Sequence, residues 1–174
     1  MTEFVLVTYA SRSGSTRGVA DAIGSSLEKN GVKKVDVQPM QLVKTLQPYR
    51  AVVAGSAIQN KRWLPEAMEF VQVHRSELMQ KPFAAFLVCM TLAMKNGENY
   101  RPFVSDFMAP VRVLVNPVSE GLFAGSLDLR KIPSVRDRLL FRLSVIFGIW
   151  QEGDHRNWEA IQAWAECLLP LLRC

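Results

Sequence analysis

Four hydroxyl side chains gather around a single glycine near the start of the chain: Ser11, Ser13, Ser15 and Thr16 flank Gly14. The segment follows an apolar run at residues 4–7 and precedes a stretch with helical periodicity. Where a strand passes through such a turn into a helix, free backbone N–H groups and the positive end of the helix dipole meet. Hydroxyls can donate to phosphate oxygens, and a glycine lets the backbone approach closely. The segment therefore predicts a phosphate cradle.

The spacing excludes two common nucleotide motifs, because the three-glycine dinucleotide fingerprint and the Gly-Lys-Ser/Thr ending of the P-loop are both missing. A hydroxyl loop without a lysine suits a terminal monoester phosphate that carries no metal, and flavin mononucleotide (FMN) is the candidate. The segment Ser11-Arg12-Ser13-Gly14-Ser15-Thr16 resembles the flavodoxin phosphate loop, roughly Ser/Thr-x-Thr/Ser-Gly-x-Thr. The alternative is a solvated loop in which a serine caps the helix.

Strand and helix patterns alternate along the chain. Strands are predicted at residues 4–9, 35–37, 51–55, 83–90 and 121–124, and helices at 14–30, 65–80, 99–115 and 157–172, with a short helix or turn at 40–46. This order predicts an α/β fold, a flavodoxin-like doubly wound parallel sheet of five strands with helices on both faces. We expect residues 1–174 to form one domain, with an insertion at 126–156 that adds a helix before the last one.

Ligands of such folds bind beyond the carboxyl ends of the strands, so the loops at 11–16, 56–64 and 91–96 should converge. From the second loop we expect cofactor contacts by Ser56, Ala57, Ile58, Gln59 and Asn60. Ser56 and Asn60 could reach ribityl hydroxyls or ring carbonyls, and Ile58 or Trp63 could lie against the ring. Trp63 could instead anchor the start of a helix. From the third loop we expect backbone contacts by Thr91, Leu92 and Ala93.

Positive charges surround the predicted ring position, at Lys61, Arg62 and Lys95. A reduced flavin prefers to be an anion, and nearby cations stabilise that anion. We therefore expect a flavin that readily accepts electrons, unless these side chains are simply solvated.

Composition points to anionic partners and to a reducing compartment. The 174 residues carry a net charge of +5, and 49% of them are hydrophobic. The three cysteines lack ligand spacing, so we predict no metal site and a cytoplasmic location. The start shows no signal-peptide pattern. The longest uncharged stretch, at 82–94, is shorter than the roughly 20 residues of a membrane span.

The insertion is both basic and strongly apolar. A helix is predicted at 134–150, where leucines, isoleucines and phenylalanines crowd beside arginines. Such a helix can lie at a membrane interface. It could equally cover the site of an apolar anionic substrate, form a homodimer contact, or pack against the sheet.

Taken together, the chain resembles the flavodoxin-like family that includes the quinone-dependent protoporphyrinogen oxidases. The resemblance rests on the phosphate loop, on segments 55–58, 63–64 and 125–128, on the inserted helix, and on the tail at 152–158. It implies FMN, oxidation of a porphyrinogen at the inner face of the cell membrane, and electron transfer to a quinone for haem biosynthesis. The porphyrinogen carboxylates would meet cations of the insertion, namely Arg130, Lys131, Arg136, Arg138 and Arg142.

Other functions stay open at this point. A soluble flavodoxin-like electron carrier or quinone reductase has the same motifs, although electron-carrying flavodoxins are typically acidic and this chain is basic. A flavin-binding interaction module without a substrate of its own is a third alternative. We expect no nucleic-acid partner. No single catalytic acid or base stands out, because His74 falls within a predicted helix and is expected to be structural. His155 is a weak candidate, so the catalytic residues stay unassigned.

Overall fold

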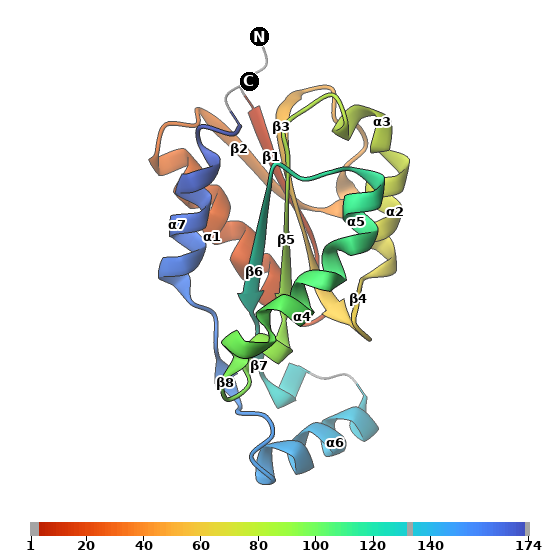
Figure 1. Ribbon diagram of the computed structural model, residues 1–174, viewed down its shortest axis with the longest axis vertical. Helices are drawn as coiled ribbons and strands as arrows, with labels where there is room; N and C mark the ends of the chain where they lie inside the picture. The colour runs from red at the N-terminus through yellow and green to blue at the C-terminus, as the bar shows by residue number, and fades with distance from the viewer. Residues whose placement is uncertain (1–3, 132–133, 173–174) are drawn as a thin grey trace.

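The computed structural model describes residues 4–131 and 134–172. Its centre is a parallel sheet in the order β2-β1-β3-β5-β6 (Figure 1). The strands are β1 (Phe4–Ala10), β2 (Lys34–Pro39), β3 (Tyr49–Gln59), β5 (Phe83–Cys89) and β6 (Ser119–Ala124). The predicted α/β fold with five parallel strands is confirmed.

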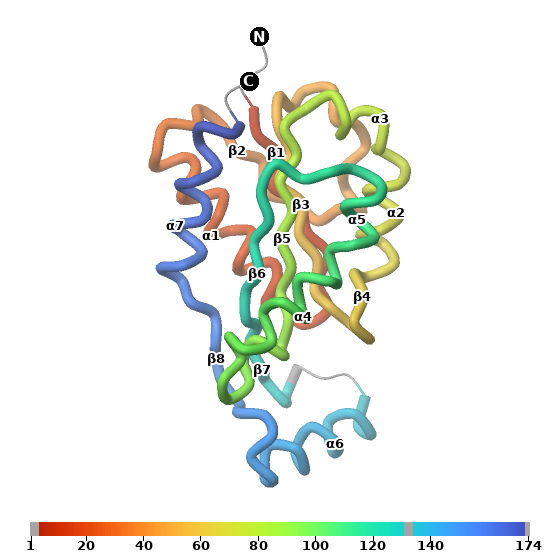
Figure 2. Tube along the Cα trace, viewed as in Figure 1, coloured from red at the N-terminus to blue at the C-terminus, as the bar shows by residue number. Residues whose placement is uncertain are grey.

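Helices cover both faces of the sheet (Figures 1 and 2). On one face lie α1 (Ser15–Lys29) and α7 (Trp158–Leu168), and on the other lie α2 (Pro65–Val73), α3 (Arg75–Leu78), α4 (Arg101–Ser105) and α5 (Ala109–Leu114). Successive strand residues point to opposite faces, so the core is divided in two. Val5 and Val7 pack with Ile23 of α1, whereas Leu6 packs with Phe70 of α2.

Several predicted helices are shorter than expected or interrupted. The helix predicted at 99–115 is split into η3 (Gly97–Tyr100), α4, η4 (Asp106–Met108) and α5, because Pro102 and Pro110 each begin a new helix. Residues 65–80 form two helices, α2 and α3. The short helix or turn predicted at 40–46 contains the 3-10 helix η1 (Met40–Leu42).

The sequence did not reveal a hairpin at the end of β3. β4 (Arg62–Trp63) pairs antiparallel with β3, so that Ile58 faces Trp63. The two turn residues, Asn60 and Lys61, have φ angles of 51° and 61°. This geometry is typical of a two-residue hairpin turn, which usually carries a glycine as its sequence signal. Asn-Lys lacks that signal, and the prediction missed the turn.

The insertion projects beyond the carboxyl end of β6 (Figures 1 and 2). β7 (Ser126–Leu127) and β8 (Gly153–Asp154) pair antiparallel as a short two-stranded sheet at its base. Between them lie η5 (Leu129–Lys131) and α6 (Val135–Ile146). The helix predicted at 134–150 thus ends earlier, close to Gly148 with its φ of +71°. The remaining short element, η2 (Met90–Ala93), follows β5.

Candidate functional site

The hydroxyl loop is closed by its own first serine. Ser11 Oγ accepts a hydrogen bond from the Gly14 N–H at 3.0 Å, and Gly14 has a φ of +89° that favours glycine. Among the described residues, no side chain caps the start of α1. The first N–H groups of a helix have no partner within the helix, so those of α1 remain available to an anion.

Thr16 lies at the base of this loop and is fully buried. Within the described part of the chain, its Oγ1 atom has no hydrogen-bond partner. Buried polar atoms are nearly always paired, so an unpaired hydroxyl beside an uncapped helix start fits a ligand that supplies the acceptor. The residues present therefore fit a phosphate group.

Arg12 is the single cation of the loop, and an acid neutralises it. Its guanidinium forms two hydrogen bonds to the carboxylate of Glu66 on α2, one of them from Nη2 to Oε2 at 3.0 Å. These bonds hold the pKa of Glu66 below its usual value, although partial burial opposes them. The charge of a bound phosphate would thus be met mainly by hydroxyls and backbone N–H groups.

A cavity of about 440 Å³ joins the first two predicted loops at the carboxyl end of the sheet. Six residues of the predicted site line it, namely Arg12, Ser13, Ser15, Ala57, Ile58 and Gln59. Val88 and Met90 contribute from the end of β5. The opposite wall comes from the insertion, through Gly125, Ser126, Leu127, Ser134, Asp137 and Phe141. The sequence analysis named none of this last group as site residues.

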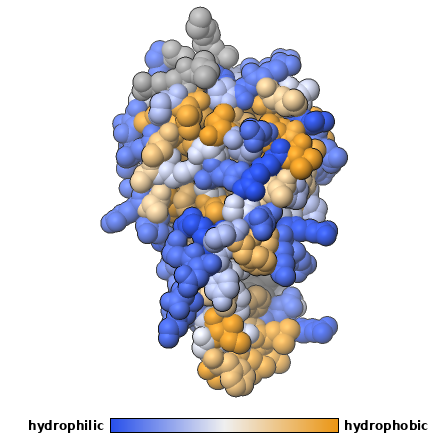
Figure 3. All heavy atoms as spheres, viewed as in Figure 1, coloured by the Kyte–Doolittle hydropathy of each residue, from blue (hydrophilic) through white to orange (hydrophobic). Residues whose placement is uncertain are grey.

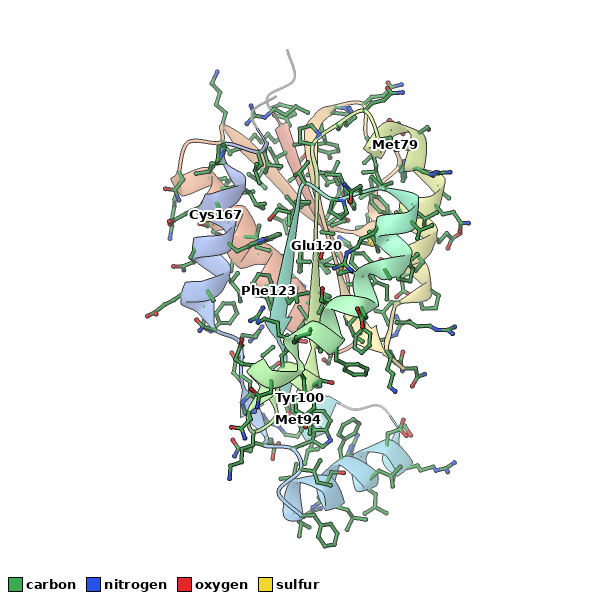
Figure 4. The ribbon with its side chains drawn as sticks, in the orientation of Figure 1. Met79, Met94, Tyr100, Glu120, Phe123 and Cys167 are labelled. Carbon is green, nitrogen blue, oxygen red and sulfur yellow. The ribbon has the colours of Figure 1, made fainter. Side chains whose placement is uncertain are left out.

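A second cavity of about 280 Å³ adjoins the first and shares Ile58 and Met90 with it. It contains Asn60 and Thr91 from the predicted site, beside Lys61, Phe103, Phe107 and Trp150. Lys61 Nζ lies 5.5 Å from the centre of the Phe103 ring. In Figure 4, Met94 and Tyr100 of the chain that follows β5 lie between the end of the sheet and α6. Of the third-loop residues predicted as contacts, Thr91 lines this second cavity.

Some predicted contacts are directed into the protein instead. The Ser56 hydroxyl is fully buried, donates to the Ala57 carbonyl at 2.7 Å and accepts from the Leu64 N–H at 3.0 Å. It closes the β3–β4 hairpin, so it does not reach a ribityl chain. Trp63 is 3% exposed and packs in the core, which fits its alternative role as an anchor. Leu92 is also buried, so only its backbone can serve a ligand.

The cations of the insertion do not line the main cavity. Arg130 pairs with Asp128 at 3.0 Å and borders a separate groove. Arg136, Arg138 and Arg142 are exposed on α6. The side chain of Lys131 lies outside the part that the structure describes. A carboxylate and a phenyl ring, those of Asp137 and Phe141, stand at the cavity where arginines were expected.

Arg156 connects the end of the insertion to the phosphate loop. It forms two hydrogen bonds to Asp154, at 2.7 and 2.8 Å, which hold the pKa of Asp154 below its usual value. Its Nη1 donates to the Ser15 carbonyl at 3.3 Å, and its guanidinium lies 4.4 Å from the Trp158 ring centre. A Cβ on Gly18 would stand 2.4 Å from Nη1, so a larger residue at this position would displace the guanidinium. The tail at 152–158 contributed only to the resemblance, and this link was not predicted from the sequence.

Comparison with known families gives a match between residues 6–145 and the flavodoxin domain model. The chain belongs to the flavodoxin domain family. The match ends within α6, so β8 and α7 lie beyond it. A search of the curated proteins found no match.

Solved flavodoxins share the fold of this flavodoxin-domain chain at low sequence identity. Flavodoxin 2 from Bacillus cereus is 23% identical, with a TM-score of 0.59, over 95% of this chain and 97% of that one. A short-chain flavodoxin associated with a bacterial microcompartment is 15% identical, with a TM-score of 0.60, over 96% and 97%. Fusobacterium nucleatum flavodoxin, solved with bound flavin mononucleotide, is 11% identical, with a TM-score of 0.58, over 98% and 99%.

Neither histidine of this flavodoxin-domain chain enters the cavity. His74 Nδ1 lies 3.3 Å from Glu77 Oε1, and its ring packs against Phe70. His155 Nε2 lies 2.8 Å from the Gln151 carbonyl within the insertion. Both rings have structural partners.

Proposed function

We propose that this chain is an FMN-dependent oxidoreductase that takes electrons from a porphyrinogen and passes them to a quinone. The observation that carries this proposal is the shared cavity, in which the phosphate loop faces a wall supplied by the insertion. An electron carrier must present its redox group to other proteins. A partly enclosed, mostly apolar cavity suits a small organic donor instead.

FMN is the cofactor, and several residues fit its phosphate. The first N–H groups of α1, the unpaired Thr16 hydroxyl, Ser13 and Ser15 would hold it. Family membership and the FMN-bound flavodoxin of the same fold support this assignment. When bound, FMN accepts a hydride equivalent from the donor. Ala57, Ile58 and Met90 would position the ring and exclude water from it.

Cations near the ring position favour the reduced cofactor. Lys61 borders the second cavity, and Arg62 follows it in the hairpin. A positive charge close to the ring stabilises the anionic reduced form more than the neutral oxidised form. This arrangement supports a flavin that accepts electrons from an organic donor rather than one poised at very low potential.

The outer face of α6 is proposed to dock on an anionic membrane surface, where a quinone is available. None of its 12 residues is buried, and Figure 3 shows apolar side chains gathered over this part of the molecule. Within the described residues, every helix falls short of the length and hydrophobicity that a membrane span requires. The exposed apolar residues are Val135, Leu139, Leu140, Leu143, Ile146 and Phe147. Arg136 and Arg142 flank them and suit anionic headgroups and the porphyrinogen carboxylates.

A second candidate is a flavodoxin-like electron carrier or quinone reductase. The flavodoxin domain match and the fold similarity to flavodoxins favour it equally at that coarser level. The insertion distinguishes the two candidates, because a carrier has no need of a wall over its cofactor. The third alternative, an interaction module, would use α6 for contact with a protein or with a second copy.

Turnover decides between these candidates. The FMN-loaded protein is given protoporphyrinogen IX and menaquinone without oxygen, and porphyrin fluorescence is followed. We expect multiple turnovers, with slower reaction when a flavodoxin reductase replaces the porphyrinogen as donor. Efficient reduction by the reductase without porphyrinogen oxidation would support the carrier. A colourless protein that does not bind added FMN would exclude both.

A further inference from the structure

The inner face of α6 has a different chemistry from the outer face. Ser134, Asp137 and Phe141 line the main cavity, at a spacing of three and four residues that places them on one side of the helix. Phe141 is half-buried there, whereas Phe147, six residues further along the chain, is 76% exposed. The helix therefore presents a carboxylate and an aromatic ring to the cavity, opposite the phosphate loop.

The charge of this wall is negative. Two charged side chains line the main cavity, and Arg12 is already paired with Glu66. The Asp137 backbone N–H donates to Ser134 Oγ at 3.3 Å, which fixes the first turn of α6. Its carboxylate, in contrast, has no ion-pair partner among the residues that the structure describes. An acid in the first turn of α6 also stabilises the helix through its dipole, so Asp137 has a structural role that is distinct from ligand binding.

A carboxylate at this point attracts the N–H groups of an organic donor and repels its carboxylates. Ionised carboxylates form strong hydrogen bonds with N–H groups, and they repel the carboxylates of a ligand. An apolar ring system that turns several N–H donors toward this wall therefore fits against Asp137 and Phe141. Its own carboxylates would extend away from this wall, toward the arginines on the outer side of α6.

We propose that Asp137 and Phe141 bind the electron donor, with Asp137 accepting hydrogen bonds from ring N–H groups and Phe141 packing against the ring. The inference rests on the proposed function, since it assigns residues to the donor of that same site. This binding mode distinguishes the donor from its product. A porphyrinogen is puckered and can turn its pyrrole N–H groups out of the ring plane toward Asp137, whereas the planar porphyrin product keeps its N–H groups turned to the ring centre.

The experiment measures binding without turnover. The holoprotein is reduced completely in the absence of oxygen, so that the donor can bind but cannot transfer electrons. Protoporphyrinogen IX and protoporphyrin IX are each titrated by anaerobic ultrafiltration, and the retained ligand is measured as porphyrin fluorescence after oxidation. We expect the wild type to bind the porphyrinogen at least about tenfold more tightly than the porphyrin, the lower limit for one charge-assisted hydrogen bond.

Three variants interpret the titration. Asp137→Asn should bind both ligands with nearly equal affinity, because it loses the charge that favours outward N–H groups. Phe141→Leu should weaken both ligands several-fold without removing the preference, since both have rings to pack. Glu152→Gln is the matched control, because Glu152 is an exposed acid of the same insertion that borders a different groove. FMN affinity of each variant verifies that the site is intact.

The outcomes separate the two proposals. If the wild type binds neither tetrapyrrole, the proposed function fails, and this inference fails with it. If the wild type prefers the porphyrinogen and Asp137→Asn retains that preference, the inference is wrong while the proposed function stands. An equal loss in Glu152→Gln would point to the net charge of the insertion and would likewise overturn the role of Asp137.

Discussion

Helices α1 and α6 contribute residues to opposite walls of one cavity, and they are built in opposite ways. Eight residues of α1 are buried, and no described side chain caps its start. In α6 no residue is buried, and Ser134 caps its start. The core holds α1 rigidly and leaves its first N–H groups to a ligand. At the start of α6, by contrast, the Ser134 side chain accepts a hydrogen bond from a backbone N–H group, while the sides of the helix are not buried against the protein.

The difference implies that α6 depends on what binds beside it. Among its connections to the domain are the β7–β8 pairing, the cavity wall and the Arg156 contacts near the start of α1. A helix with so few buried contacts contributes little to global stability and opens most readily. Under the proposed function, a cofactor or donor that contacts both walls of the cavity would stabilise α6.

The largest contrast is expected in stability. Ile23 of α1 is fully buried and Ile146 of α6 is 70% exposed. Ile23→Ala should lower the free energy of unfolding by about 2–5 kcal/mol, because it leaves a cavity in the core. Ile146→Ala should change it by less than about 0.5 kcal/mol. Urea denaturation of both variants measures this, and equal losses would show that α6 is part of the cooperative core.

The second contrast concerns cofactor affinity. Ser13→Ala and Thr16→Ala should each weaken FMN binding by about 1–3 kcal/mol, since each removes a hydrogen bond to a charged group. Ser144→Ala is the control on α6. The Ser144 hydroxyl donates to the Leu140 carbonyl at 2.9 Å and does not line the cavity. Titration of the apoprotein by flavin fluorescence gives the affinities. Unchanged binding in both loop variants would place the phosphate elsewhere.

A third test separates the two faces of α6. Phe147→Ser should reduce binding to anionic lipid vesicles about tenfold, because it removes a large apolar side chain from the outer face. Phe141→Leu, on the inner face, should leave vesicle binding nearly unchanged. Co-sedimentation with anionic and with neutral vesicles measures both. Wild-type protein that ignores vesicles but forms a dimer lost in Phe147→Ser would instead assign this face to a second copy.

A smaller effect is expected on the reduction potential. Lys61→Gln should lower the two-electron potential of bound FMN by about 10–30 mV, where 30 mV corresponds to about 1.4 kcal/mol. Lys29→Gln, in the last turn of α1 and far from the cavity, should not change it. A redox titration with an indicator dye compares the two. An equal shift in both variants would show that only net charge matters.

The fold and one wall of the site could be predicted from the sequence, and the reasons are physical. Buried parallel strands form continuous apolar runs, and a phosphate loop is local in sequence, so Ser11–Thr16 could be found directly. The opposite wall could not, because Asp137 and Phe141 reach the cavity only through the β7–β8 pairing across 25 or more residues. Composition drew attention to the arginines of α6, whereas the helix rotation turns a different pair of residues inward.

The Ser56 hydroxyl shows a second limit. It lies in the predicted loop but is hydrogen-bonded within the β3–β4 hairpin, and that hairpin depends on left-handed backbone at Asn60 and Lys61. Nothing in the residue types at those two positions demands that conformation. Polar residues in a ligand loop therefore divide into those that face the ligand and those that hold the loop, and only the folded backbone separates them.

The smallest expected effect concerns the ion pair that links the phosphate loop to α2. The pKa of Glu66 is lowered in the folded protein, chiefly by hydrogen bonds from Arg12. A lowered pKa means that the pair stabilises the fold above the ordinary glutamate pKa and that this contribution is lost as pH falls through the folded value. Because Arg12 is half-exposed, the contribution is at most about 1 kcal/mol.

Glu66→Gln should therefore be slightly less stable than the wild type at pH 7 and equally stable near pH 3, in urea melts of the FMN-free protein. The pair Arg17 and Asp21 on the exposed face of α1 provides the control, because Asp21→Asn removes a longer and more exposed contact of 3.7 Å. If Asp21→Asn produces the larger pH-dependent loss, the loop is not fixed by α2. The open start of α1 would then be ordered by its ligand alone, as α6 is expected to be.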